Sequence, residues 1–335
     1  MDFTNREVYL KSLKDIKEHK INVQPSLIYQ LLIKVNEFEN FTSLIVNFDS
    51  KIKDIDKFNQ LFNRLKNGEP FEYVVNEASF VSLMLYVDNN VLIPRVETEG
   101  LMNIVNKIID DNKLNDSTII DMCTGSGCIG LYMKYTHRNS RVIVSDISKE
   151  ALKIAKKNSE NLNLEIEVLE SDKLDVFLKN HIKCDIFLSN PPYVERKEDI
   201  FDEVKKYEPM NAVFVENNDT FYEECFKHYK EVMNDKFLMA FEINYDQKER
   251  LTKLIGKYFT NDDTKFLFLK DIFGKDRYLI ILGGYDVTYF QMWSWKSNWY
   301  YKKRWFSLFS YWNSFWFRLY CKQRRIFFKN GQGEK

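Results

Sequence analysis

The four residues Asn190-Pro191-Pro192-Tyr193 combine two hydrogen-bond acceptors, two rigid prolines and an aromatic ring. They follow the apolar segment CDIFLS (184–189), which is typical of a buried strand. The Asn190 side-chain oxygen and the Pro191 carbonyl could both accept from one NH2 group, while the Tyr193 ring lies against its flat face. The prolines fix φ and remove two backbone donors. This arrangement suits methylation of a planar, weakly nucleophilic nitrogen, although an ordinary Pro-Pro turn would use the same residues.

A second candidate site is the glycine-containing turn DMCTGSGC (121–128), which follows a strand and opens a helix. Its glycines let the backbone approach a ligand closely, and the helix N-terminus offers free N–H groups. Asp146 ends the next strand, where a carboxylate could hold ribose hydroxyls. The spacing of glycines in GSGCIG (125–130) also matches dinucleotide-binding turns, so a dehydrogenase competes on this turn alone. The Asn190 turn, expected at the same sheet edge, favours a methyltransferase instead.

Two further polar segments are candidates for ligand contacts. Asp172 follows the third strand in ESDKL and could accept from an adenine amino group, cap a helix, or do both. The run LIPRVETE (92–99) precedes a helix, and Arg95, Glu97 and Glu99 are candidates for the rim of the site. Acidic residues in a first helical turn also stabilise the helix dipole, which is the purely structural interpretation of the same run.

The elements that would position these residues alternate between helix and strand from residue 95 to 283. The expected helices cover 97–112, the stretch from the glycine turn to 136, 148–161, 173–180, 219–233 and 246–259. The expected strands cover 118–122, 141–146, 165–169, 184–190, 236–243, 265–269 and 277–283, the last two as an antiparallel pair. This alternation predicts a doubly wound, Rossmann-like α/β sheet.

Residues 1–75 have a different pattern and predict a small helical domain. Apolar residues recur at helical spacing in 5–18, 26–38 and 52–66. Residues 76–94 are expected to form a β-rich interdomain linker, with strands on either side of a turn at Asp88-Asn89-Asn90. We therefore expect domains at 1–75 and 95–283, joined by this linker.

Charge and cysteine content restrict the class of protein. The 335-residue chain has 49 basic and 49 acidic residues, but 10 of the basic and 2 of the acidic ones lie in 284–335, which leaves a net charge of −8 on residues 1–283. An acidic body does not favour a stable nucleic-acid partner. The five cysteines include no CxxC pair, so we expect no metal site and a reduced, cytoplasmic location. We also expect no transmembrane segment, because no long uncharged apolar run occurs.

The segment 284–335 differs in composition from the rest of the chain. It holds all six tryptophans and 19 aromatic residues in total. Such a segment could bind a membrane interface, form a stacking surface for RNA, or be the product of translation past a frameshift. Its status stays open at the level of the sequence.

In combination, these motifs resemble the protein-(glutamine-N5) methyltransferases that modify class I peptide-chain release factors. The resemblance spans about residues 1–283 and is more specific than NPPY alone, which adenine and guanine N-methyltransferases share. The matching segments are GEPFEYV (68–74), VLIPRVETE (91–99), DMCTGSGCIG (121–130), NPPYV (190–194), YEP (207–209), FEI (241–243) and KDIFGKDR (270–277).

The resemblance implies a methyl donor, an acceptor and a set of site residues. The donor would be S-adenosylmethionine, and the acceptor would be the glutamine of the Gly-Gly-Gln loop of a release factor. Asn190 and Pro191 would accept from that glutamine, Tyr193 would stack on it, Pro192 would complete the motif, and the helical domain would dock the release factor, with the enzyme acting as a monomer. The implied donor-binding residues are Asp121, Cys123, Thr124, Gly125, Ser126, Gly127, Asp146, Asp172, Lys173 and Asn190.

Four positions depart from the family pattern and bear on donor affinity more than on chemistry: Val96, Cys123, Lys173 and Asn244. Two other acceptors keep the same fold, namely a ribosomal-protein glutamine and an adenine or guanine of nucleic acid. The nucleic-acid acceptor would require basic surface near the site and room for a flipped base. A non-enzymatic binding module is a third hypothesis, which the intact NPPY turn and Asp146 oppose.

Overall fold

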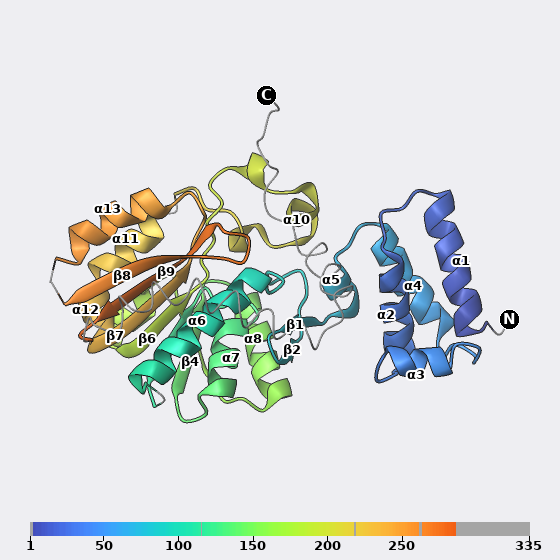
Figure 1. Cartoon of the computed structure of the whole chain (residues 1–335), viewed down its shortest axis with the longest axis horizontal. Helices are drawn as coiled ribbons and strands as arrows, with labels where there is room; N and C mark the ends of the chain where they lie inside the picture. Colours follow the sequence, from blue (N-terminus) through green and yellow to red (C-terminus); the bar gives the residue numbers. More distant parts are fainter. Residues whose placement is uncertain (1–2, 115, 218, 261–262, 286–335) are drawn as a thin grey trace. The chain divides into compact units, whose positions relative to one another are not determined.

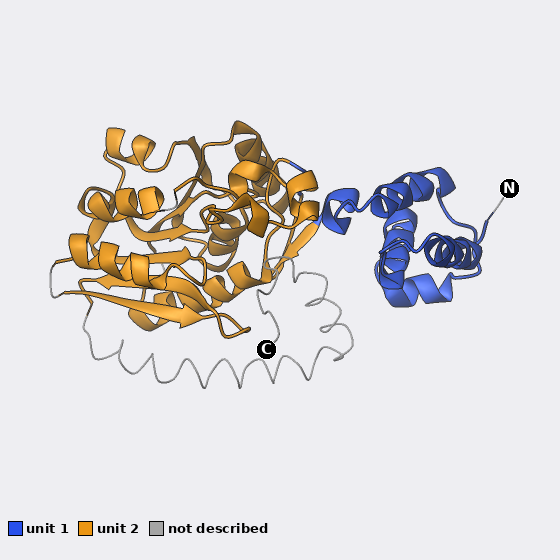
Figure 2. Ribbon diagram, turned by 90° about the horizontal axis from the view of Figure 1, so that it is seen from above, with its two compact units in different colours: residues 1–77, 87–89 blue, residues 78–86, 90–335 orange. Residues whose placement is uncertain are grey.

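The structure is a computed structural model, which describes residues 3–114, 116–217, 219–260 and 263–285. The chain divides into two compact units, one of residues 1–77 and 87–89 and the other of residues 78–86 and 90–335 (Figure 2). From residue 286 onward, the aromatic segment singled out in the sequence lies outside the described residues. Within the described part of the chain, no helix has the length and apolar character that crossing a membrane requires.

The first unit is helical and has its own core. The helices are α1 (Asn5–Glu18), α2 (Pro25–Asn36), α3 (Phe41–Val46), α4 (Ile55–Lys66) and α5 (Phe71–Val75). Thr4 and Glu7 form a reciprocal capping box at the start of α1. Fully buried Ile28, Leu31 and Leu32 of α2 occupy the centre of the core. The three helices expected from periodicity correspond to α1, α2 and α4, whereas α3 and α5 are too short to show a periodic signal.

The second unit begins with a short antiparallel hairpin, β1 (Ala78–Phe80) and β2 (Leu83–Leu85). The sequence-based prediction of this region was wrong in detail, because the hairpin reverses at Val81-Ser82. A turn does occur at Asn89-Asn90, but residues 91–93 after it form no strand. Val81 has φ 51°, a left-handed conformation that a β-branched residue rarely adopts and that residue propensity therefore does not reveal.

A seven-stranded sheet forms the centre of the second unit (Figure 1). Its strands are β3 (Thr118–Met122), β4 (Arg141–Asp146), β5 (Glu167–Glu170), β6 (Cys184–Ser189), β7 (Met233–Glu242), β8 (Thr264–Lys270) and β9 (Asp276–Gly283). Their order is β5-β4-β3-β6-β7-β9-β8. The first five strands pair in parallel, while β9 is antiparallel to both β7 and β8. This confirms the doubly wound α/β sheet and the antiparallel final pair.

Helices cover both faces of the sheet, and alternate strand residues face opposite cores (Figure 1). One core contains residues of α6 (Val96–Asn112), α7 (Cys128–Thr136) and α8 (Lys149–Leu162). The other contains residues of α9 (Asp175–Lys179), α11 (Asp219–Lys227), α12 (Tyr229–Val232) and α13 (Lys248–Tyr258). The expected helix 219–233 is divided into α11 and α12 at His228.

A long segment between β6 and α11 has a small cluster of its own. It contains a 3₁₀ turn (Lys197–Asp199), α10 (Asp202–Tyr207) and a second 3₁₀ turn (Met210–Ala212). Val194 bridges to Phe214, and the buried Ile200 and Val204 pack beneath this bridge. The segment therefore returns to the end of β6, where Asn190 lies.

Candidate active site

The glycine-containing turn after β3 is held from inside by Asp121. This fully buried carboxylate accepts hydrogen bonds from the Thr124 hydroxyl and from the Gly130 backbone N–H, the latter at 2.9 Å. Burial raises the pKa of Asp121 to about 7, against the lowering effect of these two donors. Asp121 therefore shapes the turn and joins it to α7.

The turn has an unusual backbone that leaves open space above it. Cys123 adopts φ 59°, a left-handed conformation that residues with a β-carbon rarely adopt. At Gly125, a β-carbon would meet no atom within 4 Å, so the backbone there faces empty space. Gly127 (φ 83°) is the N-cap of α7. A ligand could approach this backbone without meeting side chains.

Asp146, at the end of β4, lies beside this turn. Its Oδ2 accepts from Gly125 N at 3.0 Å, and its Oδ1 accepts from Ser148 N at 2.9 Å. Burial raises the pKa of Asp146, although backbone N–H donors oppose the shift. A carboxylate oxygen has two lone pairs, so both oxygens can still accept from ligand hydroxyls.

Asp172 and Lys173 follow β5, at the same edge of the sheet. Lys173 forms an ion pair with Glu224 of α11 at 3.3 Å and adopts φ 45°. Ser171 N donates to the Asp146 carbonyl at 3.1 Å, which joins this segment to the end of β4. The segment thus forms the far wall of the same site.

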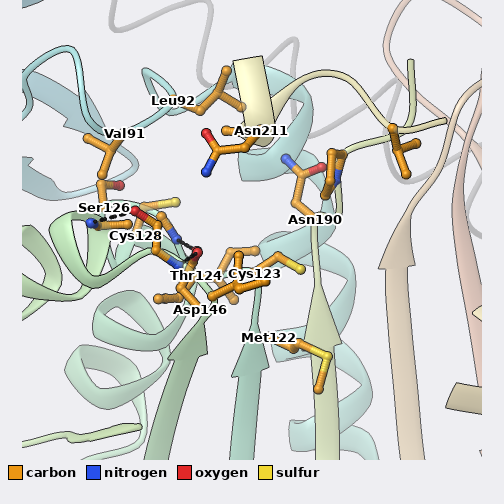
Figure 3. Close-up of a pocket in the computed structure, with 18 of the residues that line it drawn as sticks. Val91, Leu92, Met122, Cys123, Thr124, Ser126, Cys128, Asp146, Asn190 and Asn211 are labelled. Carbon is orange, nitrogen blue, oxygen red and sulfur yellow. Dashed lines mark hydrogen bonds between the residues drawn. The ribbon is translucent and has the colours of Figure 1, made fainter. Parts of the chain in front are cut away.

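A cavity of about 340 Å³, within the range of small-molecule sites, connects these segments (Figure 3). Figure 3 shows Cys123, Thr124 and Asp146 at the strand ends, with Asn190 and Asn211 on the opposite side of the space. The residues predicted from the sequence that line it are Arg95, Cys123, Thr124, Gly125, Ser126, Asp146, Asp172, Lys173, Asn190 and Pro192. The predicted residues outside the lining set are Asp121, Gly127, Pro191, Tyr193, Glu97 and Glu99.

The Asn190 turn leaves β6 next to the end of β3. Ser189 Oγ donates to the Met122 carbonyl at 2.7 Å, which fixes the two strand ends together. Asn190 Nδ2 donates to Thr98 Oγ1 at 3.1 Å, and the Tyr193 hydroxyl donates to Glu242 Oε1 at 3.3 Å. Because β3, β4 and β6 are adjacent and parallel, Asn190 lies at the same edge as the glycine turn and Asp146, as the sequence indicated.

The three charged residues at the start of α6 have different surroundings. Arg95 lines the cavity, but its buried guanidinium donates to Glu208 at 2.5 Å. The Glu97 carbonyl accepts from the Tyr278 hydroxyl at 2.8 Å. The Glu99 carboxylate accepts from Val81 N at 3.1 Å, in the β1–β2 hairpin. The structure therefore brings only Arg95 to the cavity wall.

Sequence reasoning passed over two residues that contact the Asn190 turn. Thr98 is 2% exposed and Glu242 is 1% exposed, and they are joined by a hydrogen bond of 2.6 Å from Thr98 Oγ1 to Glu242 Oε2. A signal was present, since Glu242 interrupts the apolar strand segment FLMAFEI (237–243). An acidic residue in such a strand has to find donors when it is buried.

Comparison with known proteins identifies the family. Residues 101–207 match the methyltransferase small domain. A release factor glutamine methyltransferase of Mycoplasma mycoides is 32% identical over 250 residues, covering 72% of this chain and 88% of the relative. A release factor glutamine methyltransferase of Clostridium botulinum is 36% identical over 241 residues, covering 70% and 83%. The chain belongs to the release factor glutamine methyltransferase family. Among solved structures, a methyltransferase from Pyrococcus furiosus aligns with a TM-score of 0.42 and 15% identity, over 61% of this chain and 90% of that one.

As a member of this family, the protein is a methyltransferase whose methyl donor is S-adenosylmethionine. The residues present fit that donor. Gly125 leaves open space where a β-carbon would stand, and α7 begins just beyond it with its N-terminus toward the turn. Asp146 offers lone pairs for hydroxyl groups at the end of the neighbouring strand.

Proposed function

We propose that this protein transfers a methyl group from S-adenosylmethionine to the side-chain amide nitrogen of the glutamine in the Gly-Gly-Gln motif of peptide-chain release factors. The observation that carries the proposal is the place of Asn190. It lines the same cavity as Asp146 and the glycine turn, so a nitrogen held by Asn190 would lie beside the donor site. The relatives' shared name supports the choice of release factors as substrate.

The Asn190 turn would do the chemical work by orientation and electrostatics. An amide nitrogen is a weak nucleophile because its lone pair is delocalised into the carbonyl. The Asn190 Oδ1 and the Pro191 carbonyl would accept from its NH2 group, which fixes its direction and stabilises the positive charge that develops on it. The Tyr193 ring would cover the face of the amide. The amide proton would leave to water after transfer.

Donor-binding roles follow from the cavity walls. S-adenosylmethionine, when bound, supplies a methyl group activated by its sulfonium. Residues 123–127 would hold its methionine end, Asp146 its ribose, and Asp172 with Lys173 would flank its adenine. Of the three charged residues at the start of α6, we retain Arg95 as a wall residue that anchors Glu208. We assign no substrate contact to Glu97 and Glu99, because neither is among the lining residues of the cavity.

The helical first unit would dock the remainder of the release factor. What supports this role is that the unit has a core of its own. It also has a hollow of about 590 Å³ between α1 and α4, lined by both apolar and charged side chains. We expect the enzyme to act as a monomer.

The test is methyl transfer from labelled S-adenosylmethionine to a purified release factor, with the labelled residue mapped. We expect label on the Gly-Gly-Gln glutamine, and a roughly 100-fold lower single-turnover rate for Asn190→Ala. Asn180→Ala is the matched control, because this exposed amide caps α9 and donates only to the Val176 carbonyl. Label on a ribosomal-protein glutamine or on RNA would refute the assigned substrate, and an unchanged rate for Asn190→Ala would refute the assigned role.

A further inference from the structure

A buried hydrogen-bond chain runs from the Asn190 amide to a carboxylate. Asn190 Nδ2 donates to Thr98 Oγ1 at 3.1 Å, and Thr98 Oγ1 donates to Glu242 Oε2 at 2.6 Å. The chain connects three elements, since Thr98 belongs to α6, Glu242 ends β7 and Asn190 follows β6. Thr98 lines the cavity and Glu242 is not among its lining residues, and the donor-binding roles above assign nothing to either of them.

The direction of this chain is decided by proton count. A threonine hydroxyl has one proton, and an ionised carboxylate can only accept. Thr98 therefore has to give its proton to Glu242, and its oxygen is left as an acceptor. Only the NH2 end of the Asn190 amide can satisfy that oxygen. If the Asn190 amide were flipped by 180°, its oxygen would face the Thr98 oxygen with no proton between them. Two buried acceptors in contact are unfavourable.

We propose that Thr98 and Glu242 are positioning residues that hold the Asn190 amide with its oxygen directed toward the acceptor glutamine. The inference rests on the proposed function, because it gives a structural cause for the orientation that the acceptor role requires. Without the chain, the two ends of the asparagine amide are nearly equal in size and shape. Either end could then face the substrate, and the NH2 end would repel the NH2 group to be methylated.

The same carboxylate also holds the other end of the motif. The Tyr193 hydroxyl donates to Glu242 Oε1 at 3.3 Å. Burial raises the pKa of the Tyr193 phenol, so its hydroxyl stays protonated and can serve as this donor. The guanidinium carbon of Arg277 lies 6.0 Å from the Tyr193 ring centroid. The positive charge of Arg277 lowers the pKa of Glu242 and so offsets part of the rise that burial causes. Glu242 therefore fixes both residues that flank the two prolines.

The position of Thr98 allows a sharp test with two complementary variants. Thr98→Val keeps the shape of the side chain and removes the hydroxyl, whereas Thr98→Ser keeps the hydroxyl. We expect Thr98→Val to lower the single-turnover rate of methyl transfer roughly 10- to 100-fold through loss of alignment. Thr98→Ser should retain most of the rate. Because Thr98 also lines the cavity, the rates are compared at saturating S-adenosylmethionine, so that a change in donor affinity does not enter the comparison.

A double-mutant cycle separates positioning from general damage. If Thr98 acts only through Asn190, then Thr98→Val adds no further loss in an Asn190→Ala background. If Thr98→Val merely loosens the fold, its loss multiplies that of Asn190→Ala, which would overturn the inference. Ser117→Ala is a control for the removal of a buried hydroxyl, because Ser117 donates to the Leu114 carbonyl away from the cavity.

Glu242→Gln provides the second variant if Thr98→Val does not fold. Glutamine can donate to Thr98, which frees the threonine proton to point at Asn190 and removes the preference for one amide orientation. We expect a reduced rate that is not additive with Thr98→Val. A wild-type rate for Thr98→Val or Glu242→Gln, with Asn190→Ala still impaired, would overturn the inference alone. A wild-type rate for Asn190→Ala would overturn the proposed function as well.

Discussion

Glu242 holds both ends of the Asn190 turn, through Thr98 at one end and directly at Tyr193 at the other. Burial raises the pKa of Glu242 to about 7, and nearby Arg277, Thr98 and Tyr193 reduce the shift. The titratable and charged groups that face it come from the elements packed around it: Glu97 of α6, Cys128 of α7, Tyr193 after β6, Tyr222 of α11 and Arg277 of β9. Its protonation state therefore changes near neutral pH, at a site where one proton decides the orientation of an amide.

We predict that the single-turnover rate rises with pH and levels off above about 7, because only ionised Glu242 compels Thr98 to accept from Asn190. The measurement is the rate between about pH 5.5 and 8.5, with Glu242→Gln as the comparison. The variant should lose this step. A step of the same size in the variant would show that another group, such as Asp121, is responsible.

Folding stability should depend on pH in the opposite direction. The pKa of Glu242 in the folded protein lies above its ordinary value of 4.5, so the folded state retains a proton that the unfolded state has released. The contribution of this group is complete below the ordinary pKa and is lost as pH rises through about 7. Activity and stability therefore trade against each other at the same carboxylate.

Sequence analysis placed Asn190 and Asp146 correctly at one edge of the sheet, because each lies at the carboxyl end of a strand and neighbouring parallel strands end at the same edge. Their roles in binding and catalysis stay predictions. Thr98 was not found, although it lies three and four positions before the buried Leu101 and Met102 and so shares their helical face. That face packs against β7, which ends at Glu242. The hydrogen bond between Thr98 and Glu242 therefore becomes evident only once α6 is known to pack on β7.

At the scale of elements, the close approach of α7 to the sheet sets the position of the donor turn. A β-carbon on Gly130 would lie 2.4 Å from Val144 Cγ1 and 3.2 Å from Asp121 Oδ2. The helix can therefore lie against β4 only if this residue has no side chain. Gly130 N also donates to Asp121 at 2.9 Å, so a shift of α7 would disturb the carboxylate that holds the turn.

We predict that Gly130→Ala lowers the free energy of unfolding by about 1–3 kcal/mol through overpacking, and that it weakens donor binding. Urea unfolding and equilibrium binding of S-adenosylmethionine measure the two effects. Gly256→Ala in α13 is the matched control, since a β-carbon there meets no atom within 4 Å. It should stabilise the protein by about 0.5–1 kcal/mol. Equal effects of the two substitutions would contradict the packing argument.

Element prediction from the sequence was accurate for long periodic segments and failed where backbone conformation overrides propensity. The strands of the sheet were found because each is a short apolar run between turn residues. The hairpin at residues 78–85 was misplaced because its reversal uses Val81, whereas Asn89-Asn90 is the sequence more typical of a turn. The division at His228 between α11 and α12 has no signal in the apolar spacing.

At the scale of the molecule, the last described strand completes the core of the catalytic unit. β9 lies between β7 and β8, and its residues Leu279, Ile280 and Ile281 are fully buried. At Gly283 a β-carbon would lie 2.1 Å from the ring of Phe237, so the end of β9 packs tightly against β7. Tyr285 packs against the core on the face of the sheet that α6, α7 and α8 cover. Among the residues that the structure describes, those lining the cavity all precede this point.

We therefore predict that a chain ending at Tyr285 keeps the single-turnover rate and the free energy of unfolding of the full chain. Removal of residues 286–335 also removes ten basic residues, so the truncated protein has a net charge of about −8. Rates on a release factor, measured at low and high salt, compare the two proteins. A chain ending at residue 275 is the control that loses β9, and it should not fold. If the truncated chain folds normally but loses rate on the release factor at low salt only, the basic segment assists encounter with an acidic substrate, because salt screens such attraction.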